Sequence, residues 1–135
     1  MTDDIENIED RIIIDLDRAA AEITGRLAGW RARGLVAGAV TWVDLDAPWP
    51  QPLETDRARV ARPYSVGIQV EGPGDSGLSV VLFRDGRADV DFLAVGADEV
   101  RTEAPDSATP RAFGAVLDDC VGRAFGTGRL SSPRP

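Results

Sequence analysis

Two segments rich in apolar residues, 78–84 and 87–95, are joined by the dipeptide Asp85-Gly86. Asp-Gly favours the type I′ turn of a two-residue hairpin loop, which requires positive φ at both positions. The two segments are therefore expected to pair as antiparallel strands. A strand pair with an apolar face has to be covered, so the other elements of the chain are expected to pack around a sheet.

The register of this hairpin predicts which side chains are buried. A two-residue loop places Val81 opposite Val90. One face of the pair is then apolar and is expected to face the core, with Phe83, Val81, Ala88, Val90 and Phe92. The other face carries Asp89 and Asp91, because alternate side chains of a strand point the same way. Two arginines beside the turn are expected to reach Asp89: Arg84 and Arg87.

Apolar residues at steps of three or four predict a long N-terminal helix over residues 4–33. Thr2 or Asp3 can cap its start, and the acidic residues that follow suit the positive end of a helix dipole. Gly34 is placed to end it. The weakest part of this prediction is the β-branched run 12–14, since such residues have lower helix propensity.

A second helix is predicted near the C-terminus. Thr109 can cap it, Pro110 suits its first position, and Gly126 can end it. Cys120 falls on its apolar stripe, where a small buried thiol is expected. Residues 127–135 are rich in Gly, Ser and Pro, and we expect a flexible tail there.

Further strands are predicted over 35–43, 64–71 and, more weakly, 100–103, and Trp42 is expected in the core. The glycine-rich segment 71–77 is interpreted as a hairpin turn. Short turns between strands make the sheet antiparallel, with helices at both ends of the chain. The expected fold is a single α+β domain over residues 1–126, with an antiparallel sheet of four to five strands and the C-terminal helix packed on one face.

The composition narrows the chemistry that the chain can perform. It contains no His and no Lys, and its 15 basic residues are all Arg. Ser–His and Cys–His nucleophilic catalysis, Schiff-base chemistry and imidazole-based zinc sites are therefore excluded. The single cysteine excludes an internal disulfide and a thiolate metal cluster. We expect no cofactor and no enzymatic activity.

The charge balance is acidic, with a formal net charge of −8. Such a chain repels phosphate backbones, which disfavours nucleic-acid binding and favours a basic partner. No apolar run approaches the length of a membrane span. The first ten residues are acidic where a signal peptide would be basic, so a cytoplasmic protein is expected.

Asp89 and Asp91 form the first candidate site, because both point from one face of a strand. Three interpretations remain open. The two carboxylates could hold Mg²⁺ or Ca²⁺ in a metal-dependent enzyme, although no Lys is present to assist. They could form a partner-binding face together with Val80 and Leu82, which are expected beside them. They could also be an ordinary solvated surface.

The second candidate site is the proline-rich segment 44–56, which holds Asp44, Asp46 and Trp49. Trp is enriched at binding hot spots, and a stiff loop loses little entropy on docking. The alternative is that Trp49 folds back to cover an edge of the sheet.

The segments VVLFRDGRADVDFLA and TEAPDSATPRAFGAVLDDCVGRAFG, about a third of the chain, give it a pattern-level resemblance to a known class. They resemble the small acidic immunity proteins that actinobacteria encode beside secreted polymorphic toxins. The resemblance implies an inhibitor that binds one cognate toxin, and it assigns no functional residues. A secretion-chaperone-like module that binds an extended peptide is the alternative among binding proteins.

Overall fold

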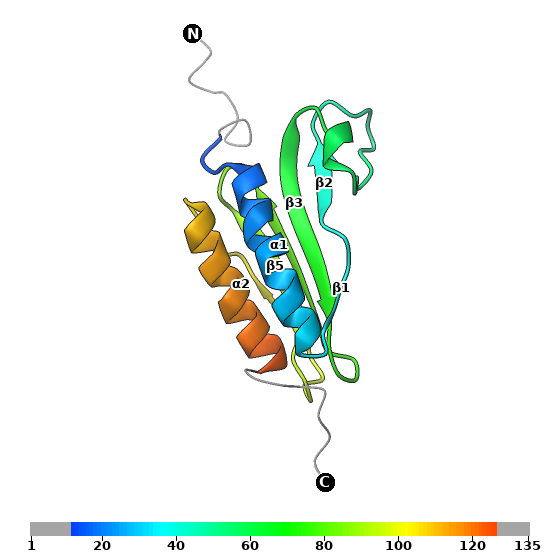
Figure 1. Cartoon of the computed structure of the whole chain (residues 1–135), viewed down its shortest axis with the longest axis vertical. Helices are drawn as coiled ribbons and strands as arrows, with labels where there is room; N and C mark the ends of the chain where they lie inside the picture. The colour runs from blue at the N-terminus through cyan, green and yellow to red at the C-terminus, as the bar shows by residue number, and fades with distance from the viewer. Residues whose placement is uncertain (1–11, 127–135) are drawn as a thin grey trace.

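The structure is a computed structural model, and it describes residues 12–126. Its elements in chain order are helix α1 (Leu16–Ala32), strands β1 (Val36–Ala37) and β2 (Thr41–Asp44), the 3₁₀ turn η3 (Arg57–Arg59), strands β3 (Pro63–Glu71), β4 (Gly77–Phe83), β5 (Ala88–Leu93) and β6 (Arg101–Glu103), and helix α2 (Pro110–Phe125). The strands form one antiparallel sheet in the order β1-β3-β4-β5-β6, and β2 also pairs with β3. Both helices lie side by side on one face of it (Figure 1). The α+β prediction is confirmed.

The hydrophobic core fills the space between the two helices and the sheet. Helix α1 contacts β1 and β3, helix α2 contacts β4 and β5, and the helices contact each other. The largest fully buried side chains come from both layers: Phe113, Phe125, Ile23, Ile68, Leu82 and Leu117. Trp42 and Cys120 are buried, as predicted. Within residues 12–126, no helix is long and apolar enough to span a membrane.

The β4–β5 hairpin forms where it was predicted, but the predicted register is wrong by one residue. Val81 pairs with Asp89, and Leu82 pairs with Ala88. The connection has three residues, because the Phe83 N–H donates to the Arg87 carbonyl (2.8 Å) and the Gly86 N–H to the Phe83 carbonyl (2.9 Å). Within this connection, Gly86 has positive φ (92°) and Asp85 does not, so a type I′ turn is excluded.

The shift moves the side chains of β4 to the opposite faces of the sheet, while those of β5 stay as predicted. Leu78, Val80 and Leu82 face the helices and are buried. Val81 and Phe83, which were expected in the core, are partly exposed on the other face. A slip of one residue has this effect because the side-chain period of a strand is two.

Helix α1 begins later than the sequence predicted. Its cap is Asp15, whose carboxylate accepts from the Asp17 N–H (2.9 Å) and the Arg18 N–H (3.2 Å). Residues 12–15 are not helical, because the Ile13 and Ile14 N–H groups donate instead to the Arg84 carbonyl (2.8 and 3.2 Å). The predicted start at Thr2 or Asp3, and the predicted tail at 127–135, lie outside the described residues. Gly34 follows the helix, as predicted.

The predicted strand 35–43 is divided in two. β1 pairs with the end of β3, and β2 pairs with its first half. Between them, only the Gly38 N–H reaches the β3 backbone, where it donates to the Gln69 carbonyl (2.9 Å). The sheet therefore has six strands, one more than the largest number expected.

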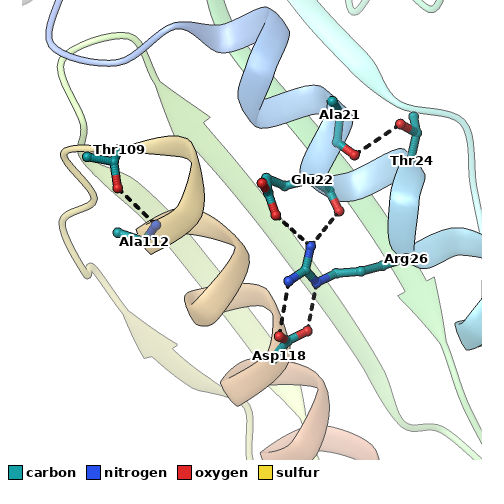
Figure 2. Close-up of polar contacts among 7 residues, drawn as sticks. All are labelled: Ala21, Glu22, Thr24, Arg26, Thr109, Ala112 and Asp118. Atoms are coloured by element: carbon teal, nitrogen blue, oxygen red, sulfur yellow. Dashed lines mark hydrogen bonds and ion pairs between the residues drawn. The ribbon is translucent and has the colours of Figure 1, made fainter.

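Helix α2 follows the prediction at both ends. The Thr109 hydroxyl accepts from the Ala112 N–H (3.0 Å; Figure 2). Pro110 is the first helical residue, and Gly126 has a φ of 81° after the last. The ring of Phe125, in the last turn, packs directly on Gly72 of the β3–β4 turn. A Cβ added to Gly72 would lie 2.5 Å from this ring. The end of α2 is thus fixed against the turn by a contact that only glycine permits.

A charged cluster joins the two helices on their outer side (Figure 2). Arg26 of α1 donates from Nε and Nη2 to the two carboxylate oxygens of Asp118 in α2 (2.7 and 3.1 Å). Its Nη1 donates to the Glu22 carboxylate (2.8 Å) and carbonyl (2.9 Å). The hydrogen bond from Arg26 lowers the pKa of Asp118, and its charge acts in the same direction. A bidentate pair of this kind fixes geometry as well as adding energy.

Replacing Asp118 with asparagine should lower the free energy of unfolding at pH 7 by about 0.5 kcal/mol, the scale of a solvent-screened pair. The folded-state pKa of Asp118 is below its ordinary value of 3.8. Its contribution is therefore complete above that value and is lost as the pH falls through the lower folded-state pKa. Urea unfolding of both proteins at pH 7 and near pH 2 measures this. A difference that persists undiminished in acid would contradict it.

Candidate functional site

The two helices leave the other face of the sheet uncovered, and we call it the open face. The strand pairings arrange its central residues in rows. One row runs from Gly67 through Val81 to Asp89, and the next runs from Gln69 through Ser79 to Asp91. The open face therefore presents two carboxylates beside a partly exposed valine, with no helix above them.

Asp89 and Asp91 are both exposed on the open face. The Asp91 carboxylate accepts from the hydroxyl of Thr102 in β6 (2.7 Å). The side chain of Asp89 makes no hydrogen bond or ion pair within residues 12–126. The predicted contacts to Asp89 from the two arginines beside the turn are absent: Arg84 is buried, and Arg87 stacks on the Phe83 ring at 4.4 Å. The contacts were predicted from a register that the hairpin does not have. In the observed register, neither arginine pairs with the Asp89 carboxylate.

Asp44 and Asp46 fix the backbone of the long loop between β2 and β3. The Asp44 carboxylate accepts from the N–H groups of Asp46 (2.9 Å), Ala61 (2.9 Å) and Arg62 (3.0 Å). These backbone hydrogen bonds lower the pKa of Asp44. Asp46 accepts from Nε of Arg62 at 2.7 Å. Both carboxylates are therefore engaged within the loop, and a partner would have to compete for them.

Trp49 projects from this loop and is 85% exposed. Leu53, four residues later, is 66% exposed. The alternative that Trp49 folds back over the sheet edge is wrong. Glu54 covers that edge instead, exchanging two backbone hydrogen bonds of 2.8 Å with Trp42. The loop thus holds an exposed aromatic side chain on a fixed backbone.

The five candidate residues lie in two separate parts of the structure. Asp89 and Asp91 lie on β5, whereas Asp44, Asp46 and Trp49 lie at and beyond the end of β2. β3 and β4 separate these two strands in the sheet. In Figure 1 the loop after β2 lies at the upper end of the sheet, beside the start of β3. A single partner that touched both groups would have to cover most of the open face.

Replacing Asp44 with alanine should loosen the loop, because three backbone N–H groups would lose their acceptor. We expect amide hydrogen exchange at Asp46, Ala61 and Arg62 to accelerate at least about tenfold, as it does when local opening becomes easier. Exchange measured by NMR at neutral pH tests this. The matched control is Asp44→Asn, which keeps one acceptor oxygen and should show a smaller change. Unchanged exchange in the alanine variant would contradict the assigned role.

The sequence did not reveal a groove of about 500 Å³ at the other end of the open face, beside the β3–β4 turn. Three acidic residues line it: Glu71, Asp75 and Asp91. Leu93 and the 63%-exposed Val100 supply apolar lining. The acidic residues on both sides of the turn were a visible signal. The groove itself depends on the packing of β5 and its following segment beside that turn.

The carboxylates of the open face do not converge on one point. Among residues 12–126, no three Asp, Glu or Cys side chains are grouped so that they could hold a metal ion. Cys120 is buried in the core, and burial raises the pKa of its thiol.

Comparisons with protein-family models, with curated proteins and with solved structures gave no match to this chain. The proposal of a function therefore depends on the residues of the chain itself.

Proposed function

We propose that this chain is a non-enzymatic inhibitor that binds one basic protein partner through its open face, as an immunity protein binds its cognate toxin. The observation that carries the proposal is the combination on that face of uncompensated carboxylate charge and exposed apolar surface. Asp89 has no partner within residues 12–126, and Val81 beside it is partly exposed. Interfaces combine apolar anchors with a charged rim in this way.

Electrostatics supports a basic partner. The chain carries 23 acidic and 15 basic residues. Many of the arginines are already paired, including Arg26, Arg57, Arg62 and Arg123. The uncompensated acids are therefore the groups that a partner would meet. Complementary charge accelerates association and suppresses wrong partners more than it adds affinity.

Trp49 supplies a candidate apolar anchor on the loop that follows β2. It is exposed on a loop whose backbone is held by Asp44 and Asp46, so little entropy would be lost when it docks. Aromatic anchors in desolvated pockets contribute most of the binding energy in typical interfaces. We assign the carboxylates of β5 to association and Trp49 to the lifetime of the complex.

The product of the reading frame adjacent to the gene for this chain is the partner to test. Co-expression followed by calorimetric titration should give a stable complex in which the partner's activity is inhibited. Limited proteolysis should leave the bound partner intact, because an inhibited toxin is folded. Digestion throughout the bound partner would indicate a chaperone client and contradict the proposal. Substrate turnover by this chain alone would also contradict it.

A further inference from the structure

The groove beside the β3–β4 turn continues into a second hollow. The second hollow, of about 340 Å³, shares Gly74, Asp75, Ser76 and Leu93 with the first. The segment after β5 completes it, including Val95, which is 49% exposed. The two hollows therefore follow the outside of the turn from the open face to the segment after β5, where the Val95 N–H donates to the Ala124 carbonyl near the end of α2 (2.9 Å). This shape is elongated and open.

The lining of the two hollows has a single sign of charge. Among residues 12–126, its ionisable residues are Glu71, Asp75 and Asp91, and no arginine of that part of the chain lines either hollow. Glu71 and Asp75 are exposed, and their side chains make no hydrogen bond or ion pair within the part of the chain that the structure describes. By contrast, another hollow is lined by residues of both signs, Asp15 and Asp17 together with Arg57, Arg62 and Arg84.

The same lining offers apolar contact. Leu93 lies between the two hollows, with Val95 on one side of it and Val100 on the other. Val95 and Val100 are among the most exposed large apolar side chains of the chain. Such side chains next to carboxylates suit an occupant that has both a positive charge and a short aliphatic group.

We propose that this groove receives an extended segment of the partner protein in which an arginine or lysine lies next to an aliphatic residue. The inference rests on the proposed function and specifies the chemistry of its partner at one place on the open face. The basic side chain would lie between Glu71, Asp75 and Asp91, and the aliphatic one against Leu93 and Val100.

Charge and size select this occupant over others. An anion or a nucleic-acid backbone would be repelled by three carboxylates. A bare metal ion would need carboxylates that converge, and none of those in residues 12–126 do so in a group of three. A volume of about 500 Å³ accommodates a few side chains and not a folded domain. An extended basic segment meets all three conditions.

The test uses the full chain and a capped peptide, GRLGRLG, with GELGELG as its charge-reversed control. In two-dimensional NMR spectra, GRLGRLG should shift the amide signals of residues 69–79 and 91–100, and GELGELG should shift none. Asp75→Arg should weaken binding about tenfold, since a like charge is then placed opposite the peptide. Asp106→Arg is the matched control, because Asp106 is exposed, lacks a side-chain partner and lies outside both hollows. It should bind the peptide as the unmodified protein does.

Three results would overturn the inference. They are shifts spread over all acidic surfaces, equal binding by the Asp75→Arg and Asp106→Arg variants, and concentration-dependent shifts of the groove residues without peptide, which would make a second copy of the chain the occupant. None of these results bears on whether the adjacent gene product binds. The proposed function fails separately, if that protein neither binds nor is inhibited.

Discussion

Replacing Asp89 and Asp91 together with arginine should weaken binding to the basic partner by about a hundredfold or more. Like charges brought together across an interface cost several kcal/mol, and each ~1.4 kcal/mol is a factor of ten in affinity. Titration calorimetry on the complex with the adjacent gene product measures the effect. Both side chains are exposed, so the Tm should stay within about 2 °C of that of the unmodified protein.

The matched control for this variant reverses two exposed acids outside β5 and outside both hollows, Asp106 and Asp119. Asp106 follows β6 and has no side-chain partner within residues 12–126, and Asp119 lies on α2, in the helix layer, where it accepts from Nε of Arg123 (3.0 Å). The control has the same net charge as the test variant, so it separates local contact from the field of the whole molecule. If both variants lost the same affinity for the partner, the loss would be explained by net charge alone and not by contacts of Asp89 and Asp91. Unchanged affinity in the test variant would remove the β5 carboxylates from the interface.

Replacing Leu82 with alanine should lower the free energy of unfolding by about 3 kcal/mol, within the range for fully buried leucines. Leu82 has no exposed surface and packs between β4 and the helices. Val81→Ala, one residue away, should cost less than about 1 kcal/mol, because Val81 is partly exposed on the open face. Urea unfolding of the two variants measures both values.

This pair of variants also tests the register of the hairpin. The two-residue loop expected from the sequence would bury Val81 and expose Leu82, so it predicts the opposite order of the two effects. A larger loss for Val81→Ala than for Leu82→Ala would contradict the observed pairing of β4 and β5. The comparison is internal, because both residues are on one strand and both changes remove only aliphatic groups.

The position of the hairpin could be predicted from Asp85-Gly86, but its register could not. A glycine after aspartate suits two connections: the two-residue type I′ turn, and a three-residue loop that ends in glycine with positive φ. Hydrogen bonds from other segments of the chain favour the three-residue loop. Arg84 accepts through its carbonyl from Ile13 and Ile14, and the Ser107 N–H donates to the Gly86 carbonyl (2.7 Å). These partners are distant in sequence.

The starts of the two helices also differed in how well they could be predicted from the sequence. The start of α2 was predicted correctly because its signals, Thr109 and Pro110, act within one turn. The start of α1 was predicted too early, because periodicity alone suggested that the helix continues through Ile13 and Ile14. Their N–H groups are used by the hairpin instead. Local capping could be read from the sequence, and competition from a distant carbonyl could not.

The candidate residues show what residue type alone leaves undetermined. Asp44 and Asp46 were selected as acids beside an exposed tryptophan, and the exposure of Trp49 agrees with one of the two interpretations. Nothing in the segment indicated that Asp44 accepts three backbone hydrogen bonds, two of them from residues 17 and 18 positions later. The groove was missed because its walls come from β3, β4 and the segment after β5.

The packing of Phe125 on Gly72 links two parts of the chain that are otherwise free to diverge. No side chain fits at position 72 while the ring occupies its present place. Even alanine at position 72 would require a smaller or reoriented side chain at position 125, or a displacement of the β3–β4 turn away from α2. A substitution at position 72 is therefore expected to be accepted only together with a compensating change at Phe125 or in the turn beside the groove.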